Sequence, residues 1–150
     1  MKLKIPPPIQ TFLAMLMMYG ANNLVQINIF DSKYTLFIIV ICCLLASFFL
    51  ISAVLGFKKL KTTVNPLKPE TASALVVKGV YKYSRNPMYA GMALFLFSWF
   101  LWLGNPINLL IFAGYIFYIT EYQIKPEEKA LAGIFASEFE MYCKNVRRWL

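Results

Sequence analysis

An uncharged apolar run from Tyr34 to Phe57 constrains the fold of this chain more than any other feature. A transmembrane helix needs about 20 apolar residues, so this run is long enough to cross a bilayer. Of the 150 residues, 59% are hydrophobic, whereas a soluble domain is about half apolar. Three further apolar runs cover residues 9–30, 87–103 and 107–123. We therefore expect one all-α membrane domain over residues 1–150, with four transmembrane helices.

The basic residues predict how such a domain is oriented. The loop 58–86 has a single acidic residue, Glu70, against Lys58, Lys59, Lys61, Lys68, Lys78, Lys82 and Arg85. The tight connections 31–33 and 104–106 have almost no net charge. Because cytoplasmic loops are enriched in Lys and Arg, we expect this loop, both termini and any site built on it to be cytoplasmic. The protein is expected to be a multi-pass protein of a bacterial inner membrane.

The loop 58–86 also has internal organisation. Turn-forming residues occupy 62–70, and residues 72–77 form a short apolar piece. An apolar piece in a cytoplasmic loop needs a surface to pack on. We expect the loop to fold back over the membrane face.

Net charge and the side-chain inventory exclude several functions. We assign the formal net charge of +8 to topology and to contacts with anionic membrane lipids rather than to nucleic acid. Cys42 and Cys43 are adjacent in an apolar run and Cys143 is distant, so we expect no disulfide and no metal site. The chain has no histidine, which is the commonest general base and a common metal ligand. The pattern does not indicate an oligomeric state.

Residues 126–148 predict an amphipathic helix. Pro126 suits its first turn, where Glu127 and Glu128 are favoured by the helix dipole. One apolar face follows from the three- and four-residue steps between Leu131, Phe135, Phe139, Tyr142 and Val146. This helix either lies on the membrane surface or covers a pocket.

The turn at 79–91 is the second place where polar chemistry gathers. Asn86 is a good N-cap and Pro87 suits the first helical position, so a helix is expected to start there. If 87–103 and 107–123 pack antiparallel, this turn and the acidic pair meet at the same end. Carboxylates suit ammonium or ribose hydroxyl groups, and aromatic rings suit adenine or a sulfonium ion. Taken singly, the same residues also fit a plain cap, helix-start charges, interfacial anchors and lipid phosphate contacts.

Two stretches carry a resemblance to a known family. The first is Arg85-Asn86-Pro87-Met88-Tyr89 followed by Gly91, and the second is Glu127-Glu128 followed by Leu131, Phe135, Phe139, Tyr142, Val146 and Arg147. They are similar to the Arg-His-Pro-x-Tyr-x-Gly signature and the closing Glu-Glu…Leu…Phe-Gly…Tyr…Tyr…Val-x-Arg pattern of the isoprenylcysteine carboxyl methyltransferase and phospholipid methyltransferase family. The match runs from about Thr62 to the C-terminus.

The resemblance implies an enzyme that transfers a methyl group from S-adenosylmethionine to a lipophilic acceptor entering sideways from the bilayer. It implies catalytic roles for Arg85 and Glu128. It implies a cofactor site made of Ser73, Ala74, Leu75, Val76, Tyr81, Asn86, Pro87, Met88, Tyr89, Glu127 and Glu128. The acceptor is left open between an isoprenylcysteine-like carboxylate, a phospholipid amine and another lipophilic small molecule.

The chain departs from the family pattern at four positions. The signature histidine is Asn86, which cannot titrate. The glycine after Phe135 is Ala136, and the first tyrosine is Phe139. Carboxyl methyltransferases place an arginine for the substrate carboxylate where this chain has Gln123, which weakens the case for a prenylcysteine carboxylate.

Two other functions compete with methyl transfer. A membrane reductase of the steroid-reductase type would use a reduced nicotinamide, but no further basic cluster for a 2′-phosphate is evident. A non-enzymatic four-helix protein is the other. Proton-coupled export needs an ionisable residue inside a span. The first three expected spans contain no ionisable residue, and Glu121 lies at the end of the fourth. The sequence therefore disfavours a proton-coupled exporter but leaves a non-enzymatic scaffold open.

Overall fold

The structure, a computed structural model, describes residues 5–25, 27–29, 33–60 and 73–150. The expected turn-rich segment 62–70 and the connection at Asp31 and Ser32 lie outside the described residues. All regular structure within the described ranges is helical. The main helices are α1 (Pro7–Leu24), α2 (Lys33–Lys59), α3 (Pro87–Leu103), α4 (Asn108–Ile119) and α5 (Lys125–Asn145), with a 3₁₀ turn η2 (Gly79–Lys82) and a π-helical turn η3 (Thr120–Ile124).

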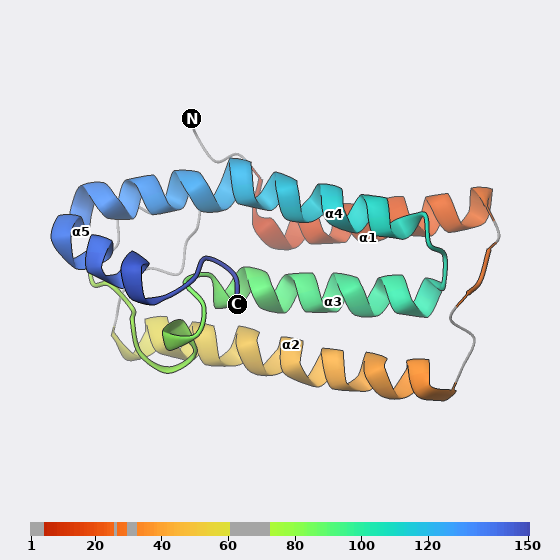
Figure 1. Cartoon of the computed structure of the whole chain (residues 1–150), viewed down its shortest axis with the longest axis horizontal. Helices are drawn as coiled ribbons and strands as arrows, with labels where there is room; N and C mark the ends of the chain where they lie inside the picture. Colours follow the sequence, from red (N-terminus) through yellow and green to blue (C-terminus); the bar gives the residue numbers. More distant parts are fainter. Residues whose placement is uncertain (1–4, 26, 30–32, 61–72) are drawn as a thin grey trace.

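The helices lie side by side and run in alternating directions (Figure 1). α3 is central and packs against α1, α2 and α4. The start of α3 and the ends of α2 and α4 lie at the same end of the molecule, as the antiparallel argument predicts. The turn 79–86 and α5 gather at this end, which we call the pocket end.

Small residues let α2 approach α3 closely. A Cβ on Gly91 of α3 would lie 2.8 Å from Leu50 Cγ and 3.0 Å from the carbonyl oxygen of Ala46, both on α2. Ala46 and Ala53 are fully buried. Small residues at helix–helix contacts are typical of membrane proteins, where packing drives association.

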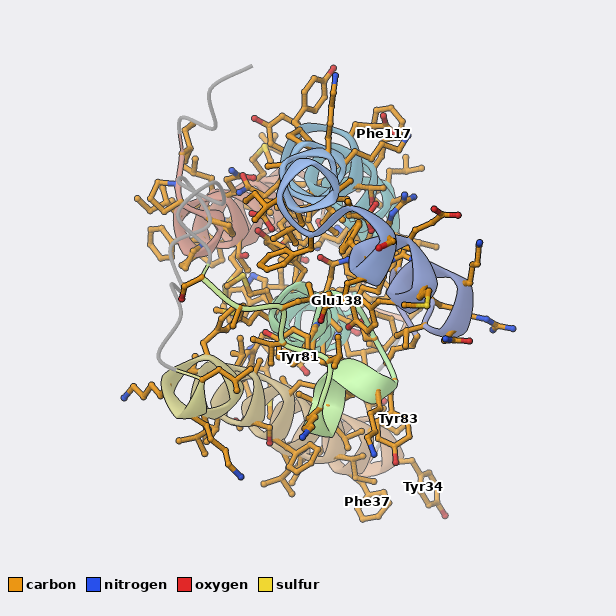
Figure 2. All side chains as sticks on the ribbon, turned by 90° about the vertical axis from the view of Figure 1, so that its left-hand side faces the viewer. Tyr34, Phe37, Tyr81, Tyr83, Phe117 and Glu138 are labelled. Carbon is orange, nitrogen blue, oxygen red and sulfur yellow. The ribbon has the colours of Figure 1, made fainter. Side chains whose placement is uncertain are left out.

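Among the described residues, one helix is long and apolar enough to cross a membrane, Tyr34–Lys59. α3 is a shorter apolar helix. The outward side chains Tyr34, Phe37 and Phe117 are 65–68% exposed and point away from the molecule, as Figure 2 shows. The apolar surface that these helices present outward is what lipid would cover.

The first expected span, 9–30, is too long. α1 ends at Leu24, and Ile27, Asn28 and Ile29 have no regular secondary structure. The Ile29 N–H donates to the Gly104 carbonyl at 3.0 Å, and Asn28 lies against Gly104, whose φ of +69° only glycine adopts readily. The polar end of this run therefore packs on the α3–α4 connection instead of extending the helix.

The fourth expected span and the amphipathic helix are not separate elements. α4 continues through η3 into α5 without a break in the helix. The helix changes direction later, at a kink within α5 at Ala136 (φ 38°, ψ −113°). Pro126 has no N–H to continue the ordinary helical ladder, and the wider π turn lies just before it. The break at Ala136 folds the second half of α5 back toward the start of α3.

Candidate functional site

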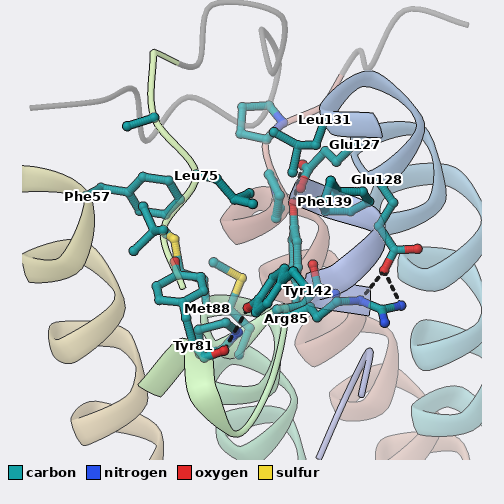
Figure 3. Close-up of a pocket in the computed structure, with 18 of the residues that line it drawn as sticks. Phe57, Leu75, Tyr81, Arg85, Met88, Glu127, Glu128, Leu131, Phe139 and Tyr142 are labelled. Atoms are coloured by element: carbon teal, nitrogen blue, oxygen red, sulfur yellow. Dashed lines mark hydrogen bonds and ion pairs between the residues drawn. The ribbon is translucent and has the colours of Figure 1, made fainter. Parts of the chain in front are cut away.

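A cavity of about 340 Å³ lies at the pocket end, between α2, α3, α5 and the start of α1 (Figure 3). Its polar groups come from the turn before α3 and from the first turn of α5. Its walls are otherwise apolar and aromatic. The lining residues are Pro6, Pro7, Pro8, Phe57, Ala74, Leu75, Val76, Tyr81, Arg85, Asn86, Pro87, Met88, Tyr89, Met92, Glu127, Glu128, Leu131, Phe139 and Tyr142.

Glu127 is a carboxylate held by neutral donors. The Tyr89 hydroxyl donates to its Oε1, and Gln123 Nε2 donates to the same oxygen at 2.8 Å. No Lys or Arg forms an ion pair with it among the described residues. Burial, together with the charge of Glu128, raises the pKa of Glu127 to about 7, and the two hydrogen bonds oppose that rise. The Glu127 carboxylate therefore supplies the cavity with a negative charge that no basic side chain among the described residues neutralises, and a cationic ligand could pair with it.

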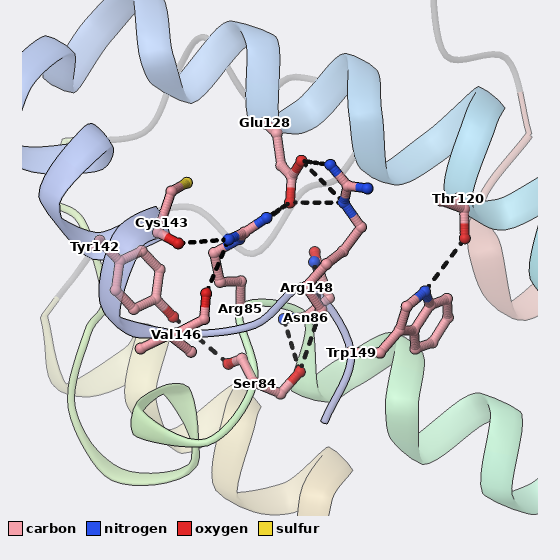
Figure 4. Close-up of polar contacts among 10 residues, drawn as sticks. All are labelled: Ser84, Arg85, Asn86, Thr120, Glu128, Tyr142, Cys143, Val146, Arg148 and Trp149. Carbon is pink, nitrogen blue, oxygen red and sulfur yellow. Dashed lines mark hydrogen bonds and ion pairs between the residues drawn. The ribbon is translucent and has the colours of Figure 1, made fainter.

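Glu128, the next residue, has the opposite environment (Figure 4). Arg85 Nε and Nη2 donate to its Oε1 at 3.1 and 2.9 Å, and Arg148 Nη2 donates to its Oε2 at 2.7 Å. Burial alone would raise the pKa of Glu128, but hydrogen bonds and charge from Arg148 and Arg85 lower it below its ordinary value. Glu128 is therefore a fixed, compensated charge.

Arg85 joins Glu128 to the second half of α5. Its Nη1 donates to the carbonyl oxygens of Cys143 at 3.1 Å and Val146 at 2.8 Å. Cationic donors at helix C-termini satisfy carbonyls that have no partner in the helix. The Arg85 side chain is 12% exposed and its donors are directed at these partners, so it has little capacity left for a ligand.

Aromatic rings form one side of the cavity. Tyr81 packs edge-on against Phe57 with ring centroids 5.6 Å apart, and the buried side chains of Val76 and Val80 belong to the same hydrophobic cluster. The Tyr142 hydroxyl donates to the Tyr81 carbonyl at 2.7 Å, which ties α5 to the turn before α3. Burial raises the pKa of both tyrosines, so both hydroxyls stay protonated at neutral pH.

The structure brings the predicted site residues together, with one exception. Ser73 is exposed and does not line the cavity, whereas Ala74, Leu75 and Val76 do. Asn86 precedes α3 as expected, but its side chain makes no capping bond. Instead, Asn86 Nδ2 donates to the Arg148 carbonyl at 3.0 Å. The amide at the family's histidine position is therefore engaged in a contact with the C-terminal residues.

Sequence reasoning missed part of the wall. The sequence indicates no site role for Pro6, Pro7 and Pro8, and it places Phe57 and Met92 only within expected transmembrane helices. The apolar face of α5 held the clue to Leu131, Phe139 and Tyr142. The structure places this face over the cavity, which favours the covering role of the helix.

Two details of the family comparison need correction. From the sequence, the replacement of the family's glycine by Ala136 is expected to be mild, but the backbone there has a positive φ of 38°, which glycine tolerates and alanine does not. The C-terminal arginine that bonds to Glu128 is Arg148, whereas the side chain of Arg147 is exposed. Counted from Val146, a Val-x-Arg spacing does reach Arg148.

Fold and site together define an all-helical protein with an apolar, membrane-length helix and an aromatic, acidic pocket at one end. The family model described as phospholipid methyltransferase matches residues 34–138, which is more than half of the chain. The chain belongs to this family of methyltransferases, as the two motifs predict. The matched region includes α2, α3, α4 and the acidic pair.

Curated relatives agree with this assignment. An uncharacterized protein of Haemophilus influenzae is 41% identical over 63 residues, which are 42% of this chain and all of that protein. The protein-S-isoprenylcysteine O-methyltransferases of Saccharomyces cerevisiae and Schizosaccharomyces pombe are 35% and 32% identical over 79 and 72 residues. These matches cover 53% and 48% of this chain but only 33% and 30% of the two enzymes. No solved structure matches the chain.

Proposed function

We propose that this protein transfers a methyl group from S-adenosylmethionine to a lipophilic acceptor in the membrane. The observation that carries the proposal is Glu127, a partly buried carboxylate without a basic partner among the described residues, in a cavity whose walls are mostly apolar and aromatic. Such a cavity favours a cation attached to an aromatic group. Membership of a methyltransferase family supports the same ligand.

The residues present fit S-adenosylmethionine. Glu127 would hold its ammonium group or ribose hydroxyls, and the aromatic side chains of Tyr81 and Tyr142, which line the cavity, would contact adenine or the sulfonium ion. When bound, the cofactor supplies an electrophilic methyl group. The protein then contributes mainly placement, because holding two reactants in alignment removes much of the entropic barrier. Arg85 and Glu128 contribute by fixing the shape of the cavity, through their bonds to each other and to α5.

The acceptor is proposed to enter sideways from the bilayer. In support, Met92 lies one helical turn further into α3 than Met88, and both line the cavity, which therefore extends along the apolar helix. We infer a four-span topology with both termini and the pocket end cytoplasmic, in a bacterial inner membrane. The basic residues around α2 and η2, Lys58, Lys59, Lys78 and Lys82, support this orientation.

Among the described lining residues no cation is left without an acidic partner, and this narrows the class of acceptor. Gln123 is buried, does not line the cavity, and donates to Glu127. The one basic residue among the described lining, Arg85, is paired with Glu128. A phospholipid amine or another lipophilic nucleophile fits this site better than a carboxylate. The same lack of an unpaired cation in the described part of the lining disfavours the phosphates of a reduced nicotinamide.

The experiment is methyl transfer in lipid nanodiscs with methyl-labelled S-adenosylmethionine. An aminophospholipid, a long-chain thiol and an isoprenylated cysteine are supplied in parallel. We expect label in the amine or thiol, at least tenfold less label with Glu127→Ala, and no change with Glu138→Ala, an exposed carboxylate on α5. Labelling of the carboxylate alone overturns the acceptor assignment, and a folded protein that labels none of the three contradicts the proposal.

A further inference from the structure

Residues 146–149 form a strap that leaves α5 and runs along the start of α3 (Figure 4). The backbone N–H of Arg85 donates to the Arg147 carbonyl at 2.9 Å. Trp149 Nε1 donates to Thr120 Oγ1 in η3 at 3.2 Å. With the bond from Asn86 to Arg148, the strap is tied to the α3 start and to the π turn.

The neighbouring residues Arg147 and Arg148 of the strap differ in the burial and the contacts of their side chains. Arg148 is partly buried and reaches Glu128 with Nε at 3.1 Å and Nη2 at 2.7 Å from Oε2. Arg147 has an exposed side chain, and only its backbone carbonyl is used. Glu128 therefore receives one guanidinium from the turn before α3 and another from the strap.

The strap follows the part of α5 that forms a wall of the cavity. Phe139 and Tyr142 belong to the second half of α5, which follows the break at Ala136. A break of this kind does not by itself fix the direction of the helix that follows. The position of that wall depends on contacts at its far end: the Tyr142 hydroxyl, the Arg85 contacts to Cys143 and Val146, and the strap.

We propose that Arg148 is a positioning residue that latches the strap to Glu128 and so holds the Phe139–Tyr142 wall against the cofactor. The proposal rests on the proposed function for the identity of the ligand. The latch itself rests on the contacts alone. Arg148 touches no reacting group, and its effect passes through Glu128 and the second half of α5.

The first test measures release of the strap without any ligand. Trypsin cleavage after Lys144, which is exposed in the last turn of α5, is followed by mass spectrometry in detergent. Charge-assisted hydrogen bonds are strong enough that Arg148→Gln should speed this cleavage on the order of tenfold. Arg147→Gln, the matched control, should leave it unchanged. Equal rates in the two variants overturn the latch.

The second test measures coupling to the cofactor. S-adenosylmethionine should slow cleavage after Lys144 in the wild type. Its Kd should rise on the order of tenfold with Arg148→Gln, while Arg148→Lys, which keeps the charge but not the planar fork, recovers part of the loss. Circular dichroism and the apo Tm identify any variant that fails to fold.

The outcomes separate the two proposals. If the wild type does not bind S-adenosylmethionine, the proposed function fails, and the ligand-free cleavage rates still decide the latch. If the wild type binds and Arg148→Gln binds equally well, the positioning role is refuted. A merely structural role would lower the Tm of apo and saturated protein alike and leave the Kd of the folded fraction unchanged.

Discussion

Replacing Ala136 with glycine should stabilise the protein. Ala136 has φ 38° and ψ −113°, a conformation in which a Cβ clashes with the backbone at a cost of about 1–3 kcal/mol. Its side chain is exposed, so removing it loses no packing. Glycine adds conformational freedom to the unfolded chain, which costs about 0.4–1 kcal/mol. The net expectation is a gain of about 0.5–2 kcal/mol.

The assay is thermal unfolding in detergent, where each kcal/mol shifts the Tm by roughly 2–4 °C for a chain of this size. The control is Ala132→Gly, an exposed position in the first half of the same helix. There glycine should cost about 1 kcal/mol and lower the Tm. The same alanine-to-glycine substitution is thus expected to raise the Tm at the break and to lower it in the regular first half of the helix. A fall in Tm for both variants would refute the assigned backbone geometry.

Three further predictions follow from the packing and the pocket. Because the pKa of Glu127 is raised from 4.5 to about 7, the folded state binds more protons than the unfolded state between these two pH values. The free energy of unfolding should therefore fall by on the order of 2–3 kcal/mol as the pH rises through that window, and Glu127→Gln should flatten the dependence of Tm on pH. Gly91→Ala should cost about 1–3 kcal/mol by forcing α2 and α3 apart, whereas Gly114→Ala, whose Cβ meets nothing within 4 Å, should be neutral or stabilising; equal shifts in Tm contradict the close approach. Tyr142→Phe should cost about 1 kcal/mol in chemical or thermal unfolding, and Tyr83→Phe, at an exposed ring, should cost nothing measurable.

Hydrophobic patterning predicted the helices because it is a local property. α3 begins at Pro87 and ends at Leu103, the limits set by an N-terminal proline and by Gly104. The meeting of the 79–91 turn with the acidic pair followed from antiparallel packing alone. The break in α5 did not follow, because alanine is the strongest helix former and its position gives no local signal. Only the comparison with the family's glycine pointed to that residue.

The division of labour between neighbouring acids also lay beyond the sequence. Glu127 and Glu128 are adjacent in the first turn of a helix and look equivalent there. The structure separates them, because one faces neutral donors from Tyr89 and Gln123 and the other faces two arginines. Such a difference depends mainly on Tyr89, Arg85 and Arg148, which lie 38, 43 and 20 residues away from their acidic partners along the chain. Sequence spacing can place two clusters at one end, but it cannot pair individual oxygens.

The most direct measurement of the central claim is calorimetric titration of S-adenosylmethionine into the purified wild type, Glu127→Ala and Glu138→Ala. Glu138 supplies a matched, exposed carboxylate on the same helix. The account predicts saturable binding to the wild type and to Glu138→Ala, with at least tenfold weaker binding to Glu127→Ala. A folded wild type that does not bind, or a Glu127→Ala variant that binds as tightly as the wild type, would contradict it.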